Sequence, residues 1–273
     1  MTQKALSHPR ADDVHVVLVE TTDPLNIGMV ARAMSNLGFK HLHLVRPRKL
    51  DRQRSNITAC QGEYLLDSMQ VHDSVAEVVA QVKDVVGFEP KAGRAAYLHY
   101  ELSEWVSHLK LPDSFPCALL FGSEDEGLSN RDIEHCRALV SLPTYGANYS
   151  FNLAQSVLLG LFSVTQAEPA QAGAAIEELP LWAEYSQLDH LMRETLVRSG
   201  FYSRKTNAEI PAILKSLVRR ARPTKREMQI LLGVFSQSAK ALRGDVPVRR
   251  MIDDPPTPKF AFPADSLTFD EEE

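Results

Sequence analysis

Residues 14–45 decide the fold: Val14–Val19 (VHVVLV), then Asn26–Leu37 (NIGMVARAMSNL), then His41–Val45 (HLHLV). The first and third segments are short, apolar and rich in β-branched residues, which predicts buried strands. The middle segment places apolar side chains at helical spacing, and Gly38 stands where a glycine commonly ends a helix. A strand, a helix and a second strand in this order predict a βαβ unit whose strands pair in parallel.

The same alternation continues to about residue 168. It predicts an α/β domain over residues 14–168, preceded by a polar tail, residues 1–13. The further elements expected in this domain are helices at Ser74–Val82, Asn130–Cys136 and Asn152–Thr165, and strands at Asp84–Phe88, Cys117–Phe121 and Ala138–Leu142.

The C-terminal part of the chain has a different pattern. Residues 169–180 are rich in Ala, Glu and Pro and are typical of a linker. Three helices are expected in a small all-α domain over residues 181–243. The proline-rich, acidic segment 244–273 is expected to be disordered.

Composition limits the classes of protein that fit. The chain has 273 residues, 44% of them hydrophobic and 24% charged, as in ordinary globular proteins. Its three cysteines, Cys60, Cys117 and Cys136, form no CxxC pair, so we expect reduced, buried thiols and no metal site. The N-terminus lacks the apolar core of a signal peptide, and no apolar run approaches the roughly 20 residues of a membrane span. A soluble, cytoplasmic protein is expected.

Charge is distributed unevenly along the chain. The formal net charge is −5, yet residues 193–226 contain ten basic and two acidic residues, a local net charge of +8. The remainder of the chain therefore carries −13. This contrast predicts a phosphate-binding surface in the helical region, with Arg219, Arg220 and Arg222 as candidate RNA contacts.

Motifs of the common nucleotide-binding folds are absent. The turn after the first strand (ETTDPLNIG) has one glycine instead of GxGxxG, and no P-loop lysine motif occurs, which argues against an NAD enzyme or a kinase. Polar segments instead follow three apolar strands, where open α/β sheets place ligand sites. In the first segment, Asn26 is either a helix N-cap or a site residue. Arg32 is either a solvated arginine or a fork for phosphate.

The second and third segments also allow two interpretations each. In Phe121–Ser129 (FGSEDEGLS), Glu124 can accept backbone N–H groups or bind a ligand hydroxyl, or the loop can simply cap the next helix. Its acidic spacing does not fit a calcium loop. In Leu142–Ser156 (LPTYGANYSFNLAQS), Ser150 or Asn152 can cap an apolar helix, and taken alone this segment indicates only a loop and a cap.

Taken together, the three segments resemble the motifs of the SPOUT family of RNA methyltransferases, in particular its TrmJ-like branch of tRNA ribose 2′-O-methyltransferases. The resemblance rests on LVETTDPLNIGMVARAMSNLGF with LHLVRP, on ALLFGSEDEGLSN, and on SLPTYGANYSFNLAQSV. It extends to LDHLMRETLVRSGF and LKSLVRRARPTKREMQILLGV near the C-terminus, and is weak between Lys49 and Phe115.

The resemblance implies a parallel sheet ending in a deep trefoil knot, a homodimer with active sites at the subunit interface, and S-adenosylmethionine as the cofactor. It implies cofactor contacts at Leu120, Gly122, Leu142, Ser150 and Phe151. Arg32 matches the family's candidate catalytic residue, and the other catalytic positions are matched by Asn26, Glu124, Ser150 and Asn152.

The chain also departs from the family pattern. Ser123 stands where relatives often carry arginine, Phe151 replaces a common leucine, and Gly87–Lys91 (GFEPK) lacks the usual Thr-Ser. The expected activity is 2′-O-methylation of cytidine or uridine at nucleotide 32 of the tRNA anticodon loop. The alternatives are another RNA target, or an RNA-binding homologue without catalysis. The sequence does not distinguish cytidine from uridine.

Overall fold

A computed structural model of the chain describes residues 10–90, 97–109, 114–167, 178–202 and 210–245. Residues 1–9 of the predicted tail, most of the predicted linker and residues 246–273 of the predicted disordered segment lie outside the described residues.

The described residues build one seven-stranded sheet in which every strand pair is parallel. The strand order is β3-β2-β1-β6-β4-β7-β5. The strands are β1 (Val14–Val19), β2 (His41–Val45), β3 (Gln70–His72), β4 (Asp84–Phe88), β5 (Leu98–Glu101), β6 (Cys117–Phe121) and β7 (Ala138–Ser141). The predicted parallel α/β architecture is confirmed.

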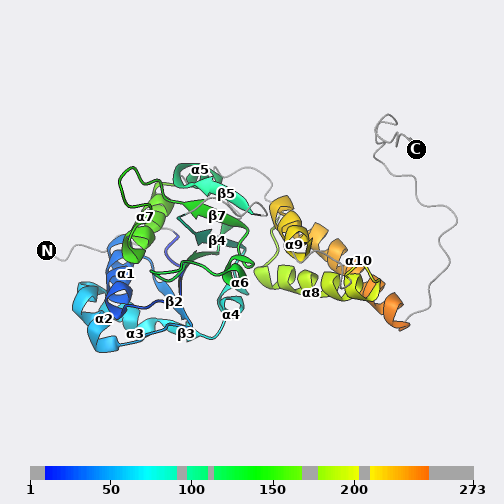
Figure 1. The fold of residues 1–273 in the computed structure, drawn as a ribbon, viewed down its shortest axis with the longest axis horizontal. Coiled ribbons are helices and arrows are strands. Elements are labelled where there is room, and N and C mark those ends of the chain that lie inside the picture. The colour runs from blue at the N-terminus through cyan, green and yellow to red at the C-terminus, as the bar shows by residue number, and fades with distance from the viewer. Residues whose placement is uncertain (1–9, 91–96, 110–113, 168–177, 203–209, 246–273) are drawn as a thin grey trace.

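Helices cover both faces of this sheet (Figure 1). One face carries α1 (Pro24–Leu37), α3 (Glu63–Ser68), α5 (Leu102–His108) and α7 (Leu153–Gln166), with α2 (Arg52–Ala59) and a 3-10 turn (Cys60–Gly62) packed against α1. The other face carries α4 (Val75–Val79) and α6 (Asn130–Ile133) and contacts the start of α8 (Trp182–Arg198), while α9 (Ile210–Ala221) and α10 (Lys225–Arg243) pack against α8.

Strand β1 shows why the sheet is buried on both faces. Val16 and Leu18 belong to the core under α1 and α7, whereas Val17 and Val19 belong to the core on the opposite face. Successive side chains of a strand point to opposite faces, so an uninterrupted apolar run fits a strand with a helix layer on each side.

The first helix begins earlier than the sequence pattern suggests. α1 starts at Pro24, and the carboxylate of Asp23 accepts a hydrogen bond from the Leu25 N–H at 3.0 Å. Proline suits the first helical position because its φ is already fixed and its missing N–H is not needed there. Asn26 is therefore not the N-cap but a buried residue of the first turn. Gly38 ends the helix in the left-handed conformation at φ 79°, as predicted.

Several elements between residues 49 and 109 were not predicted. The sequence of α2 (RQRSNITA) buries only Ser55 and Ala59, so it has no apolar periodicity to detect. Strand β3 has three residues and β5 has four, and neither is fully buried. The expectation of buried cysteines is wrong for Cys60, which is exposed, and correct for Cys117 and Cys136.

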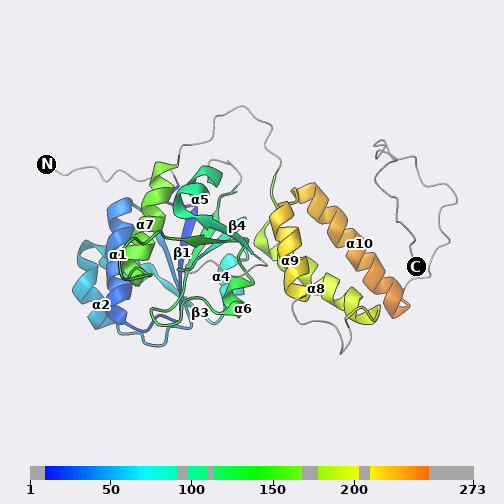
Figure 2. The ribbon, with the colours of Figure 1, turned by 45° about the horizontal axis from the view of Figure 1, so that its top comes forward.

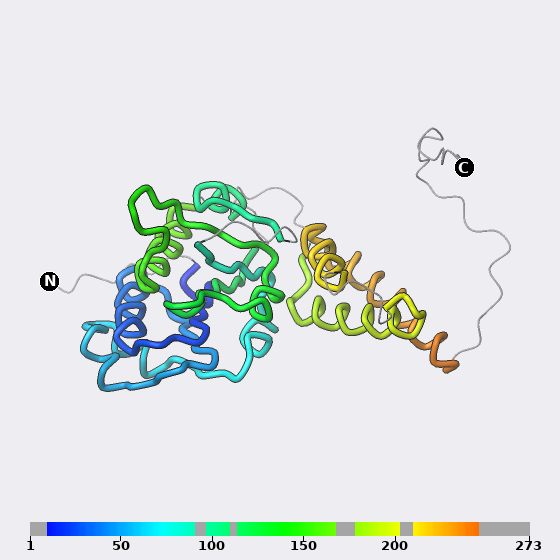
Figure 3. The backbone as a smooth tube through the Cα atoms, viewed as in Figure 1, coloured from blue at the N-terminus to red at the C-terminus, as the bar shows by residue number. Residues whose placement is uncertain are grey.

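The three predicted C-terminal helices occur as α8, α9 and α10, and the start of α8 is packed against the sheet domain. Trp182 is 1% exposed and shares a core with Val82 and Leu139. The Trp182 N–H donates to the Val82 carbonyl at 2.8 Å. Figures 2 and 3 show the resulting shape, in which the yellow and orange helices extend from one side of the α/β unit.

Candidate active site

A cavity of about 340 Å³ lies at the carboxyl edge of the sheet. It is bounded by the ends of β4 and β6, by the loop after β6, and by the segment between β7 and α7. Its lining residues are Phe88, Glu89, Pro90, Phe121, Gly122, Ser123, Glu124, Asp125, Glu126, Gly127, Leu142, Tyr149, Ser150, Phe151, Leu153 and Ser156. The volume falls within the roughly 300–1,000 Å³ typical of small-molecule sites.

The loop after β6 folds back tightly on itself. Ser123 pairs with Gly127 in an isolated antiparallel bridge, and Gly127 has φ 72°. A Cβ atom added to Gly122 would stand 2.0 Å from the Gly127 carbonyl carbon. A side chain therefore cannot be accommodated at Gly122 unless the loop moves, and backbone atoms form this wall of the cavity.

Glu124 joins the β6 loop to the loop before α1. One carboxylate oxygen accepts the Thr22 N–H at 2.9 Å and the Thr22 hydroxyl at 2.8 Å, and the other accepts the Asn26 Nδ2 at 2.6 Å. Partial burial raises the pKa of the Glu124 carboxyl, but the hydrogen bonds from Asn26 and Thr22 outweigh burial and hold this pKa below its usual range. Glu124 is therefore ionised at neutral pH and braces two loops.

Asn26 and Asn152 extend this connection to the third segment. The Asn152 Nδ2 donates to the Asn26 side-chain oxygen at 3.0 Å, while the Asn152 side-chain oxygen caps α7 by accepting the Ala154 N–H at 2.8 Å. Of the two cap candidates, Asn152 rather than Ser150 is the N-cap. The three sequence segments thus meet in one continuous chain of hydrogen bonds next to the cavity.

The family model for the SpoU rRNA methylases matches residues 13–162, more than half of the chain. This chain belongs to the SpoU rRNA methylase family. The prediction of a SPOUT-class, TrmJ-like RNA 2′-O-methyltransferase is confirmed by this match and by the curated relatives.

Two relatives and one solved structure give the extent of the similarity. A tRNA (cytidine/uridine-2′-O-)-methyltransferase TrmJ from Yersinia enterocolitica is 31% identical over 84% of this chain and 92% of its own length. The TrmJ from Pectobacterium atrosepticum is 29% identical over 84% of this chain and 98% of its own length. The crystal structure of TrmJ from Z. mobilis ZM4 has a TM-score of 0.72 at 24% identity, covering 82% of this chain and 97% of that one, which supports the fold.

Seven of the nine catalytic and cofactor residues expected from the family resemblance fall into two groups. Gly122, Leu142, Ser150 and Phe151 line the cavity, and Asn26, Glu124 and Asn152 form the chain of hydrogen bonds beside it. Leu120 does not line the cavity, because its side chain is fully buried in the core on the other side of the sheet.

Arg32, like Leu120, is an expected site residue that does not line the cavity. It is exposed on α1, six residues after Asn26, and it does not line the cavity of its own chain. Six residues correspond to about 9 Å along a helix and to a different face of it. Within the described residues, no hydrogen bond or ion pair holds the Arg32 side chain.

The sequence did not single out Thr22, Glu89 or Ser156 as site residues. Thr22 fixes Glu124, while Glu89 and Ser156 line the cavity. Glu89 is the first residue after β4, so the position of ligand sites at the carboxyl ends of parallel strands could have identified it. Ser156 had no such indication, because it lies within the predicted apolar helix.

The prediction that Arg219 contacts RNA is corrected by the structure, because Arg219 is buried. Its side chain is 4% exposed, forms an ion pair with Asp189 at 2.7 Å, and lies 5.4 Å from the ring centre of Trp182. It fastens α9 to α8 instead of facing solvent. Arg222 is partly buried and donates to the Ser114 hydroxyl at 3.2 Å, and burial lowers the pKa of its guanidinium. Of the three proposed contacts, only Arg220 is exposed.

Within the described ranges, no group of three or more His, Cys, Asp or Glu side chains is placed to hold a metal ion. No helix in those ranges combines the length and apolar character needed to cross a bilayer.

Proposed function

We propose that this methyltransferase modifies tRNA in the cytoplasm, transferring a methyl group to a ribose 2′-hydroxyl in the anticodon loop, with nucleotide 32 as the first target to test. The observation that carries the proposal is the joining of all three sequence segments through Asn26, Glu124 and Asn152 beside one cavity. The names of the TrmJ relatives support tRNA as the substrate.

The cofactor is S-adenosylmethionine, and the cavity at the carboxyl edge fits it. Phe151 is 38% exposed and offers aromatic surface for an adenine ring, while the buried Phe88 and Phe121 line the cavity from the core. Gly122 allows backbone atoms to approach a ligand closely. When bound there, the cofactor supplies an electrophilic methyl group. The chain around this cavity is proposed to be threaded into the trefoil knot of the family.

Arg32 is proposed to act on the cavity of a second copy of the chain. α1 and α7 pack together and expose apolar side chains on their outer surfaces: Met29 one turn from Arg32 on α1, and Leu158 and Phe162 one turn apart on α7. A homodimer formed through this surface covers these side chains. It also provides a route for Arg32 to approach the partner's cavity.

The residues divide the chemistry as follows. Arg32 binds the phosphate next to the target ribose, because a guanidinium forms two parallel hydrogen bonds with phosphate oxygens. Ser150 orients the ribose, so that its 2′-oxygen points at the methyl carbon. Alignment of this kind supplies up to about 7–11 kcal/mol of barrier reduction. The ribose proton passes to the adjacent phosphate oxygen, since a guanidinium held at neutral pH is too weak a base.

The substitution Arg32→Ala tests this role. We expect methyl transfer to fall by at least about a hundredfold, with the dissociation constant of S-adenosylmethionine changed by less than about twofold. The two quantities are measured by transfer of labelled methyl groups to tRNA and by isothermal titration calorimetry. An equal loss of both would remove Arg32 from the catalytic step.

The RNA target is tested separately. Bulk tRNA is incubated with the protein and labelled S-adenosylmethionine, digested, and its nucleosides are identified by mass spectrometry. The proposal expects a 2′-O-methylated pyrimidine that maps to nucleotide 32. Methylation that maps to another tRNA position would contradict the proposed target while leaving the chemistry intact.

A further inference from the structure

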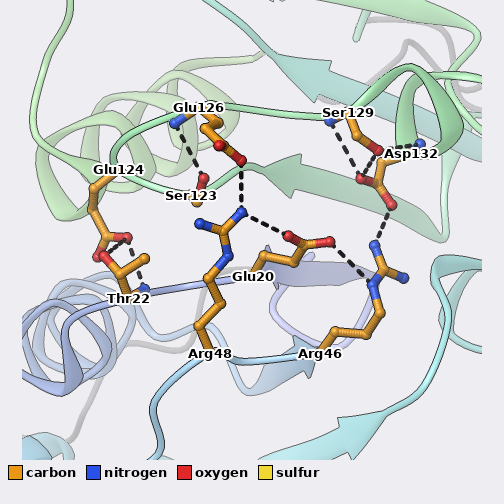
Figure 4. Close-up of polar contacts among 9 residues, drawn as sticks. All are labelled: Glu20, Thr22, Arg46, Arg48, Ser123, Glu124, Glu126, Ser129 and Asp132. Carbon is orange, nitrogen blue, oxygen red and sulfur yellow. Dashed lines mark hydrogen bonds and ion pairs between the residues drawn. The ribbon is translucent and has the colours of Figure 1, made fainter.

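Five charged side chains of alternating sign form a chain along the carboxyl edge of the sheet (Figure 4). We call this set the charge chain. Its members come from the ends of β1 and β2, from the β6 loop and from α6, and in spatial order they are Glu126, Arg48, Glu20, Arg46 and Asp132. None of them was singled out from the sequence, because the ion pairs join residues up to 86 positions apart.

The inner end of the charge chain is the more buried. Asp132 is 3% exposed and accepts a hydrogen bond from Arg46 at 2.7 Å. The second carboxylate oxygen of Asp132 accepts the Ser129 hydroxyl and, at 3.3 Å, the Ser129 N–H. This end therefore fixes the start of α6, where the β6 loop ends.

The outer end reaches the cavity. One guanidinium nitrogen of Arg48 donates to Glu126 at 2.6 Å and to Glu20 at 3.0 Å. Glu126 lines the cavity, and its N–H donates to the Ser123 hydroxyl at 3.2 Å inside the tight turn. The Arg48 N–H donates to the Thr21 carbonyl at 2.9 Å, which fixes the arginine beside the end of β1.

Backbone geometry indicates that the middle of the charge chain is held in place. Glu20 and Arg46 both have positive φ, 54° and 47°, a region that side chains other than glycine rarely adopt. Such conformations persist where surrounding contacts define them. Here the Glu20 N–H donates to the Val45 carbonyl at 2.8 Å, and the Arg46 N–H donates to the His72 carbonyl at 3.0 Å.

We propose that Arg48, anchored through Glu20 and Arg46, is a positioning residue that holds the β6 loop in the conformation that binds the cofactor. In this chain the loop has three consecutive carboxylates, Glu124 to Glu126, and its cation comes from the neighbouring β2 segment. The inference rests on the proposed location of S-adenosylmethionine in the cavity.

The exposure of these residues indicates how large the effect should be. Arg48 is 41% and Glu126 71% exposed, so their ion pair contributes little to overall stability. The ion pair between Arg48 and Glu126 instead stabilises one conformation of the β6 loop, which lines the cavity. We therefore expect a change in cofactor binding that is larger than the change in thermal stability.

The test compares Arg48→Met, Arg48→Lys and Glu126→Gln with the wild-type protein. Lys40→Met is the matched control, because Lys40 forms a 2.8 Å ion pair with Asp12 at the opposite edge of the sheet. Calorimetry with S-adenosylmethionine gives the dissociation constant, and methyl-transfer kinetics give kcat and the KM values for cofactor and tRNA. Thermal unfolding of each variant without ligand shows that it is folded.

Arg48→Met is expected to raise the dissociation constant and the KM for the cofactor about fivefold, the upper range for an exposed ion pair. It should leave kcat at saturating cofactor and the KM for tRNA unchanged, while Arg48→Lys restores part of the affinity. In the double variant with Glu126→Gln, the effect should not exceed that of Arg48→Met, since both changes break one interaction.

Three outcomes would overturn the inference. They are cofactor affinity equal to that of Lys40→Met, fully additive effects in the double variant, and a rise in the KM for tRNA alone. If the wild-type protein itself failed to bind S-adenosylmethionine, the proposed function would fail instead, so the two failures are distinguishable.

Discussion

The two edges of the sheet both contain buried or partly buried carboxylates, and they use them differently. At the amino edge, Asp84 at the start of β4 forms two hydrogen bonds with Arg137, at 2.8 and 2.6 Å, in a site where both side chains are at most 6% exposed. At the carboxyl edge, Glu124 is only partly buried and binds uncharged groups of Thr22 and Asn26 beside a cavity.

The difference separates a structural ion pair from a binding site. The Asp84–Arg137 pair joins two buried side chains of opposite charge, and neither of them lines the cavity. Glu124 instead accepts hydrogen bonds from Thr22 and Asn26, and it stands beside an open cavity. Buried charge alone would have marked both places as candidate sites. The presence of a cavity identifies only the second.

The largest effect on stability is expected at the amino edge. Asp84→Ala would leave Arg137 buried without its partner, and breaking a buried pair costs about 3–5 kcal/mol. Denaturation by urea, followed by circular dichroism, measures this loss. A loss below about 1 kcal/mol for Asp84→Ala would show that the pair does not stabilise this edge. At the other edge, Glu124→Gln should cost less in stability and more in cofactor affinity.

A second effect comes from histidines on strands β1, β2 and β3. His43 is hydrogen-bonded to His15 at 3.0 Å and to His72 at 3.1 Å, and burial lowers the pKa of His43 to about 3 and that of His15 to about 4. The unfolded chain takes up protons near pH 6.5, whereas the folded chain resists protonation, so stability is present above pH 6.5 and decreases as the pH falls.

Between pH 7.5 and pH 5, His43 alone should reduce the free energy of unfolding by about 2 kcal/mol. Urea denaturation at the two pH values measures the change. His43→Leu should make the dependence on pH shallower, and an unaltered dependence in that variant would exclude His43 as its source.

The smallest effects separate Arg219 from its neighbour Arg220. Arg219→Met removes a buried ion pair with Asp189, so we expect lower thermal stability and an unchanged salt dependence of tRNA binding. Arg220→Met should leave stability unchanged, weaken tRNA binding, and reduce the slope of log affinity against log salt by about 1. Filter binding at several salt concentrations gives the slopes. The reverse assignment of the two effects would restore Arg219 as an RNA contact.

The sequence predicted best where an element is buried on both sides or along one stripe. Local patterns were sufficient to predict the strands β1, β4 and β6 from their apolar runs and the helices α1 and α7 from their periodicity. Burial imposes those patterns directly on the sequence. The short strands β3 and β5 and the polar helix α2 were missed, since they depend on neighbours from other parts of the chain. The polar segments after the strands located the candidate site, and its individual residues came from the family resemblance.

By itself the sequence predicted the parallel α/β class and the methyltransferase family and, through the family resemblance, proposed Asn26, Glu124 and Asn152 as site residues, because those properties are encoded in local runs and in motif order. The tertiary structure alone decided which of these residues touch, that Arg219 is buried while Arg220 is exposed, and that Arg46 and Arg48 join the loops around the cavity. Such contacts join residues far apart in the sequence. The strength of the interaction between two charges depends on their burial and on partners that only the folded chain brings together.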